Sequence, residues 1–263
     1  IIGFGAIRPD GSLGGSAPFN FNPLNLFQTP LDRLQANALA SFAINDDHEA
    51  YAELIYNRSD VRQQLAPSGS FFNNYLVPIG NPFLPTLARN QLCAANGIPA
   101  ANCVVGNPQE VRLALGRRFT EFGPRLGDFE NTMFQGTVGL RGFLMDGWRY
   151  DAYYSFGEAD QVQTRGNWGS NSRVQQALRA LNTTSCTNTA NGCVPLNIFG
   201  PEGSITPAMV NFIDLDSIGR QMVNQDVLGG SLTGDFGDRL SSPMATFPVS
   251  FAFGAEHRAV DAA

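Results

Sequence analysis

The sequence predicts an all-β fold built from antiparallel strands of a transmembrane β-barrel, with long loops on the extracellular side. Several segments alternate between apolar and polar residues, and such segments come in pairs joined by short turns. Much longer irregular segments separate one pair from the next. Only 15% of the residues are charged, below the quarter that is usual in soluble domains.

The clearest strand follows the turn signal Asp146-Gly147. A period of two assigns alternate residues to opposite faces of a strand. The apolar face of this strand is predicted to carry Trp148, Tyr150, Ala152, Tyr154 and Phe156. The polar face carries Arg149, Asp151, Tyr153 and Ser155. The aromatic residues lie near both ends of the segment, as in the aromatic girdles of membrane barrels.

The same alternation predicts three hairpins, at about 31–60, 131–157 and 222–258. Between them lie two long loops, at about 61–129 and 158–221, rich in Gly, Pro and Asn. Loops of this length are uncommon in compact soluble domains, whereas short turns alternating with long extracellular loops are typical of outer-membrane barrels. Within the second loop, Thr206-Pro207 has the residue types that begin a helix.

The polar faces of the strands are predicted to line a wide aqueous lumen, because a narrow, filled barrel would not solvate them. The lumen-facing residues predicted by the alternation are Arg33, Gln35, Asn37, Glu53, Gln135, Arg141, Arg149 and Asp151.

Four cysteines form two close pairs in the sequence, Cys93 with Cys103 and Cys186 with Cys193. Four cysteines allow three disulfide connectivities, of which the two short-range pairings are the simplest. Each would staple one long loop, as expected in an oxidising compartment. Free cysteines and a zinc site are the alternatives, although the C-x-x-C spacing of many zinc sites is absent.

No catalytic motif is present: the sequence contains no G-x-S-x-G, Walker A or H-E-x-x-H pattern. We therefore expect no enzyme activity, no cofactor and no metal. The net charge of −6, without a basic cluster, argues against a nucleic-acid partner. The apolar runs are too short for a transmembrane helix.

The segment that contains Arg117, Arg118 and Arg125 has two interpretations. Guanidinium groups bind carboxylates, phosphates or sugars through paired hydrogen bonds. The alternative is an ion-pair network within the loop, with Glu121, Asp128 and Glu130 as partners.

Several short sequence segments together resemble those of the TonB-dependent outer-membrane receptors of Gram-negative bacteria, and the segment Cys193–Gly200 is the most specific of them. These segments are Phe21–Pro30, Leu65–Gly69, Asn81–Leu84, Gly116–Glu121, Cys193–Gly200 and Phe253–Arg258. The resemblance implies a barrel of about 22 strands around an N-terminal plug, importing a bulky nutrient with energy relayed by TonB. Its partners would be outer-membrane lipid, TonB and an unidentified ligand such as a siderophore or an oligosaccharide.

On this resemblance the chain covers about six strands from the middle of the barrel. The signal peptide, the TonB box, the plug and the last strand of the family are absent, so we expect an internal segment of a longer protein. Two alternatives are a passive porin-like channel and a self-assembling surface protein that uses exposed strand edges.

Overall fold

The computed structural model describes residues 6–15, 18–237, 240, 243–244 and 246–263. The chain divides into two compact units. The loop unit comprises residues 1–29, 63–127 and 164–217, and the sheet unit comprises residues 30–62, 128–163 and 218–263.

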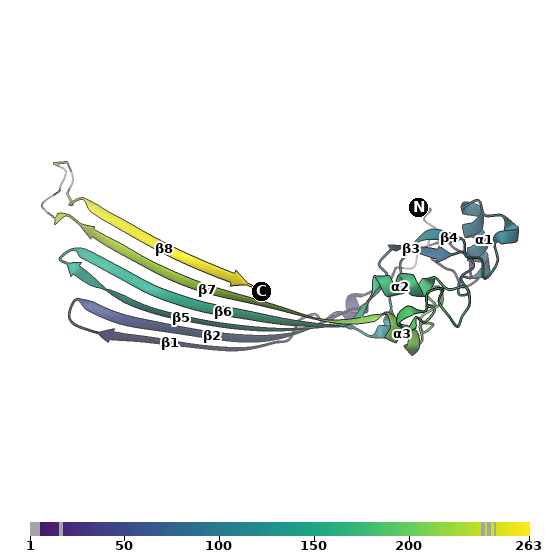
Figure 1. Cartoon of the computed structure of the whole chain (residues 1–263), viewed down its shortest axis with the longest axis horizontal. Helices are drawn as coiled ribbons and strands as arrows, with labels where there is room; N and C mark the ends of the chain where they lie inside the picture. Colours follow the sequence, from purple (N-terminus) through teal and green to yellow (C-terminus); the bar gives the residue numbers. More distant parts are fainter. Residues whose placement is uncertain (1–5, 16–17, 238–239, 241–242, 245) are drawn as a thin grey trace. The chain divides into compact units, whose positions relative to one another are not determined.

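The sheet unit is built on a six-stranded sheet in the order β1-β2-β5-β6-β7-β8 (Figure 1). Strands that follow one another along the chain are neighbours in this sheet, and the outer pairs β1–β2 and β7–β8 are antiparallel. The six strands are β1 Leu31–Ala43, β2 His48–Leu65, β5 Arg125–Met145, β6 Trp148–Gly169, β7 Asp214–Asp235 and β8 Ser250–Ala262. The predicted antiparallel all-β class is therefore confirmed.

The hairpins are longer than the sequence predicted. The prediction ended the second hairpin near residue 157 and began the third near 222, whereas β6 continues to Gly169 and β7 begins at Asp214. The predicted hairpin bounds 31–60, 131–157 and 222–258 are wrong at these ends. Strand pairing uses backbone N–H and C=O groups and does not require alternating side chains. The hydrogen-bonded strands therefore extend beyond the residues whose alternation predicted them.

The loop unit is folded, which corrects the prediction of irregular loops at 61–129 and 158–221. It contains a two-stranded antiparallel sheet of β3 Asn73–Pro78 and β4 Glu110–Leu115. Its helices are α1 Thr86–Ala95, α2 Asn171–Leu178 and α3 Pro207–Ile213, with short 3₁₀ turns at Asn22–Leu24, Ala100–Asn102, Thr120–Phe122 and Ala190–Gly192. The six-residue strands β3 and β4 are too short for a hydrophobic period to stand out in the sequence.

Helix α3 begins as predicted at Thr206-Pro207. The Thr206 hydroxyl accepts a hydrogen bond from the backbone N–H of Met209, and Pro207 occupies the first helical position. Proline loses no helical hydrogen bond at this position, because a backbone N–H there would have no acceptor within the helix.

A single apolar core holds the loop unit together. It joins both short strands and all three helices, and its most deeply buried members include Val77, Ile79, Leu92, Val174, Leu178 and Ile213. Gln175 of α2 bonds both the N–H and the C=O of Leu76, at 2.9 and 2.8 Å. The side-chain amide therefore pairs with β3 as another strand would.

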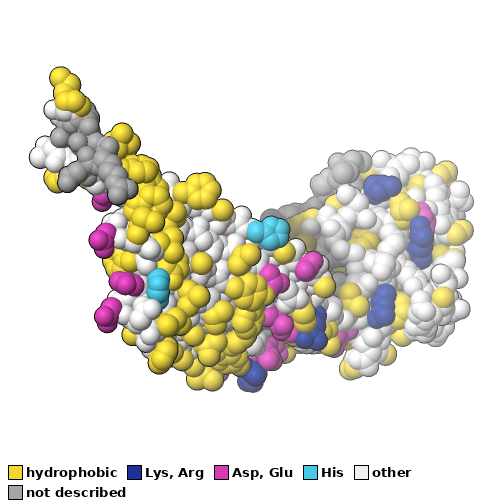
Figure 2. Space-filling view, turned by 60° about the vertical axis from the view of Figure 1, so that its left-hand side comes forward, with side chains coloured by type: hydrophobic (Ala, Val, Ile, Leu, Met, Phe, Trp, Pro, Cys, Tyr) yellow, Lys and Arg dark blue, Asp and Glu magenta, His cyan; other side chains and the backbone are white. Residues whose placement is uncertain are grey.

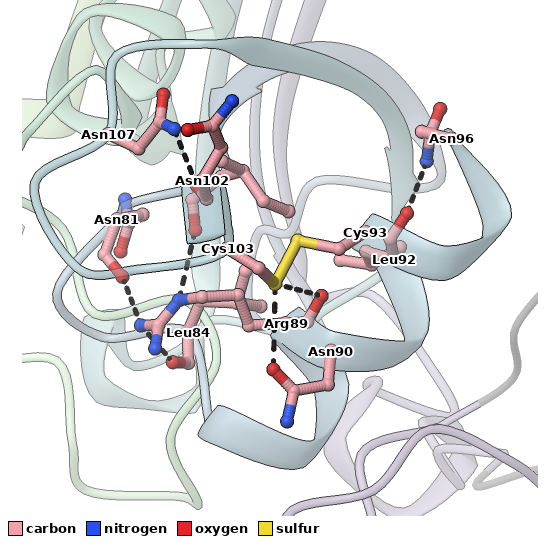
Figure 3. Close-up of a disulfide and its surroundings, with 11 residues drawn as sticks. Asn81, Leu84, Arg89, Asn90, Leu92, Cys93, Asn96, Asn102, Cys103 and Asn107 are labelled. Carbon is pink, nitrogen blue, oxygen red and sulfur yellow. Dashed lines mark hydrogen bonds between the residues drawn. A yellow bond between two sulfur atoms is a disulfide. The ribbon is translucent and has the colours of Figure 1, made fainter. Parts of the chain in front are cut away.

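Two disulfides staple the loop unit, Cys93–Cys103 and Cys186–Cys193, with Cα–Cα distances of 6.1 and 6.0 Å. These are the two short-range pairings. Beside the first, Arg89 of α1 is 4% exposed and donates to the carbonyl groups of Ile79, Asn81 and Leu84 (Figure 3). Its burial lowers the pKa of the guanidinium. Arg89 thus fastens the 79–84 turn to the helix that carries the disulfide.

Many large apolar side chains of the sheet unit are exposed. In β1–β2 the paired residues Leu34↔Arg58, Ala36↔Tyr56, Ala38↔Leu54, Ala40↔Ala52 and Phe42↔Ala50 share one face. In β7–β8 the pairs Leu232↔Phe253 and Gly234↔Phe251 continue it. Val138, Leu228 and Phe253 are 54%, 61% and 68% exposed, and apolar side chains gather over the strands in Figure 2. We call this side of the sheet the apolar face.

Aromatic rings cluster on the apolar face near the short turns. The Trp148 ring lies 4.6 Å from that of Phe251 and 6.1 Å from that of Phe236, and its indole N–H donates to the carbonyl of Asp235. Farther along β6, Phe156 contacts Phe134 with ring centroids 5.6 Å apart. The sequence predicted aromatic residues near both ends of this strand, but β6 continues to Gly169, so Phe156 lies near its middle.

Candidate ligand-binding site

The opposite side of the sheet, called here the polar face, carries the residues predicted to line a lumen. Register places Arg33, Gln35 and Glu53 there, opposite Ser59, Asn57 and Leu39. Leu39 and Ile55 are apolar exceptions on this side, and both are exposed. Antiparallel partners opposite one another point to the same face, so β1 and β2 present a mainly polar strip that Leu39 and Ile55 interrupt.

Side-chain contacts connect the remaining predicted residues across the polar face. Arg141 binds Glu49 at 3.1 Å, and the Tyr51 hydroxyl donates to Asp151 at 2.9 Å. Gln135 donates to the Ser155 hydroxyl at 3.2 Å.

Arg149 completes the set of predicted lumen-facing residues. Its guanidinium lies 5.1 Å from the centre of the Phe143 ring. All the predicted lumen-facing residues therefore lie on one side of the sheet.

The three arginines singled out in the sequence occupy two different environments in the loop unit. Arg117 is mostly buried and saturated with contacts. Its partners are the carbonyl groups of Asn197, Gly200 and Pro201, the Ser204 hydroxyl and the Glu121 carboxylate. Burial lowers its pKa, while Glu121 acts in the opposite direction.

The Glu121 carboxylate also accepts the backbone N–H of Gly203 at 2.8 Å. Arg117 and Glu121 thus fasten residues 197–204 to the 3₁₀ turn at Thr120–Phe122. Of the other proposed partners, Glu130 binds Arg58 in the sheet unit at 3.1 Å. The network interpretation therefore describes the Arg117 contacts, and its acidic partner is Glu121.

Arg118 and Arg125 are surrounded by aromatic rings. The Arg118 guanidinium lies 5.3, 5.9 and 4.8 Å from the ring centres of Phe19, Phe21 and Phe71. Arg125 lies 5.7 Å from the same Phe71 ring and 4.8 Å from that of Trp168. We call these six residues the arginine–aromatic cluster.

The two guanidinium groups of the cluster have spare hydrogen-bonding capacity. Each makes one hydrogen bond to a backbone carbonyl, Arg118 to Pro67 and Arg125 to Ala66. Neither forms an ion pair with a carboxylate in the described part of the chain. Burial lowers the pKa of Arg118. Two partly desolvated cations without a counter-ion favour an anion, and the rings offer flat apolar contact.

One of these rings belongs to a residue with an unusual backbone conformation. Phe71 and Phe72 have φ angles of 44° and 60°, in the left-handed region that large side chains seldom adopt. Both side chains remain exposed. Strain of this kind persists where the surrounding structure imposes it, and the Phe71 ring lies beside both arginines.

Sequence reasoning identified the arginines of the cluster and missed its rings. Phe19, Phe21, Phe71 and Trp168 come from three segments far apart in the chain, and no local pattern connects them. Among the described residues no helix is long and apolar enough to span a membrane. The same residues contain no group of His, Cys, Asp and Glu that could hold a metal ion.

Comparison with known proteins gives one distant structural similarity. No family model matches the chain, and no curated protein matches it. Among solved structures, the ferric-catecholate import receptor Fiu from E. coli K12 is similar at 12% identity with a TM-score of 0.27. The match covers 99% of this chain and 34% of that one, so the chain spans about a third of the receptor's length.

Proposed function

We propose that this chain forms part of the wall and extracellular loops of an outer-membrane receptor that imports a bulky nutrient. One observation carries the proposal: the six-stranded sheet exposes a band of large apolar side chains on one side and a hydrogen-bonded polar face on the other. The members of the apolar core cluster all belong to the loop unit, so the large apolar side chains of the sheet need another apolar partner.

Lipid is the partner that fits the apolar face. Exposed apolar patches of this extent cause association or aggregation in water, whereas an outward apolar band between aromatic girdles is the surface of a membrane barrel. The outer strands β1 and β8 have unpaired edges in the sheet. Unpaired backbone groups are costly in hydrocarbon, so further strands of a barrel of about 22 strands would close the wall.

The polar face would then line an aqueous lumen, and the loop unit would contact the nutrient through Arg118 and Arg125. Import would draw on energy relayed by TonB from the inner membrane of a Gram-negative cell. An active receptor accounts for the folded, disulfide-stapled loop unit better than a passive channel does, because rigid elements position ligand contacts precisely enough for selective binding.

The two tryptophans of the chain test the membrane assignment. Trp148 belongs to the apolar face and Trp168 to the arginine–aromatic cluster. In liposomes of brominated lipid, the quenched emission of each full-length variant is compared with that of the wild type, so that tryptophans elsewhere in the protein cancel. We expect Trp148→Phe to remove emission that the lipid quenches, and Trp168→Phe to remove emission that it does not quench. Loss of the same quenchable emission in both variants, or in neither, would contradict the proposal.

A further inference from the structure

A groove of about 270 Å³ lies in the sheet unit and crosses four adjacent strands, β2, β5, β6 and β7. It is lined by Asn57, Asn131, Thr132, Met133, Ala159, Asp160, Gln161, Gln221 and Val223. The alternation of the strands places the odd-numbered members on the polar face, together with Gln35, Gln135 and Asp151. The proposed receptor function assigns no role to this groove.

Side-chain amides follow one another across the strands at this level of the polar face. Asn57, Asn131, Gln161 and Gln221 lie in the groove, one on each of its four strands. Gln35 of β1 is aligned directly with Asn57 and extends the series to a fifth strand. We call these five residues the carboxamide row.

Most of the hydrogen-bonding capacity of the row is unused. Gln161 donates to the Asn131 side-chain oxygen at 2.6 Å, and this is the one side-chain hydrogen bond of the row within the described residues. The Oδ1 atom of Asn57 is buried and has no partner. A buried acceptor without a donor is unfavourable and calls for an explanation. A ligand hydroxyl or amide N–H would supply the missing donor.

The groove carries no uncompensated charge. Asp160 is the ionisable residue among those that line it, but the alternation places its side chain on the opposite side of the sheet, where it forms an ion pair with Arg220, whose Nε lies 3.2 Å from the carboxylate. The polar groups that face the groove are the side-chain amides, which are neutral and can both donate and accept. Met133 and Val223 add exposed apolar surface. A hydroxyl-rich ring with apolar faces has the matching chemistry.

We propose that this groove binds an uncharged, hydroxyl-rich ligand, namely a sugar unit of a neutral oligosaccharide. The volume lies near the lower end of small-molecule sites, as a single sugar unit requires. The inference rests on the proposed function, because that function leaves the polar face open to an aqueous lumen. It also makes the groove chemically distinct from the cationic arginine–aromatic cluster.

The test uses the full-length protein in detergent with maltotriose, cellotriose and xylotriose as neutral probes and trigalacturonate as the acidic one. We expect at least one neutral trisaccharide to bind. Asn57→Leu and Gln221→Leu should each lower its affinity about tenfold, the effect of losing one well-formed hydrogen bond to the ligand. Asn37→Leu is the matched control, since Asn37 lies on the same face outside the groove.

Thermal unfolding separates binding from folding. Asn57→Leu removes an unpartnered acceptor, so its melting temperature should be no lower than that of the wild type. The inference is overturned if no neutral trisaccharide binds, or if Asn57→Leu and Asn37→Leu bind equally well. It is also overturned if only trigalacturonate binds, with Arg118→Gln abolishing binding and Asn57→Leu preserving it.

The lipid-quenching experiment distinguishes a failure of the receptor assignment from a failure of sugar binding in the groove. Quenching of Trp148 without neutral-sugar binding would remove this inference and leave the receptor assignment intact. Sugar binding that depends on Asn57, without quenching of Trp148, would remove the membrane assignment instead.

Discussion

Replacing Val138 by Arg is expected to destabilise the membrane-inserted protein by about 2–4 kcal/mol, the cost of a cation at the lipid midplane of a barrel. Val138 is 54% exposed on the apolar face of β5, where the proposed function places hydrocarbon. Guanidinium unfolding in liposomes, followed by the shift of the folded band on an unheated gel, measures the change.

Gln135→Arg on the same strand is the matched control for Val138→Arg. Gln135 faces the polar side, where it donates to Ser155, and a charge there would remain hydrated. We expect its effect to stay within about 0.5 kcal/mol, as for surface substitutions in general. Similar losses in the two variants would contradict the assignment of lipid to the apolar face alone.

Replacing Arg117 by Ala is expected to destabilise the loop unit by about 3–5 kcal/mol, because the buried Glu121 carboxylate loses its cationic partner. The two side chains are 12% and 10% exposed, and their atoms lie 2.7 Å apart. Several carbonyl groups in residues 197–204 would also lose their donor. Hydrogen exchange of the amides in this segment reports the opening directly.

Arg179→Ala is the control for the Arg117 experiment. Arg179 also pairs with a glutamate, Glu110 at 2.6 Å, but the two side chains are 41% and 32% exposed. Exposed ion pairs contribute about 0–1 kcal/mol, so exchange should change little. Adding Glu121→Gln to Arg117→Ala should recover part of the loss, since it removes the unpaired charge. Failure of the double variant to recover would mean that the carbonyl contacts dominate.

The sequence predicted the structure best where the conformation depends on a few consecutive residues. Alternation with a period of two located the strands around Leu34, Val138 and Trp148, because each residue's side of the sheet depends only on its position in the strand. The start of α3 at Thr206-Pro207 was predictable for the same reason, since capping involves only a few consecutive residues.

The loop unit was less predictable because its contacts join distant segments. Arg118 is near Phe119 in the sequence, yet the rings that surround it are Phe19, Phe21 and Phe71. The role of Arg117 likewise depends on residues 197–204, far along the chain. Short elements such as β3 and β4 acquire their stability from the shared core and not from a pattern of their own.

The carboxamide row was missed for a different reason. Gln161 and Gln221 fell inside the predicted 158–221 loop, because the predicted strands ended where the apolar alternation ended. Once β6 continues to Gly169 and β7 begins at Asp214, the alternation assigns both residues to the polar face. Because the predicted ends of β6 and β7 were wrong, the sequence did not predict the groove.

Spin labels placed singly at residues 134–141 of β5 test most directly whether the two faces of the sheet contact different solvents. In the reconstituted full-length protein we expect labels at the even positions, which include Phe134, Val138 and Leu140, to be accessible to oxygen dissolved in lipid. Labels at the odd positions, which include Gln135 and Arg141, should be accessible to a water-soluble nickel reagent. An alternating pattern would support the account, whereas even positions that are open to the nickel reagent, or shielded from both reagents, would contradict it.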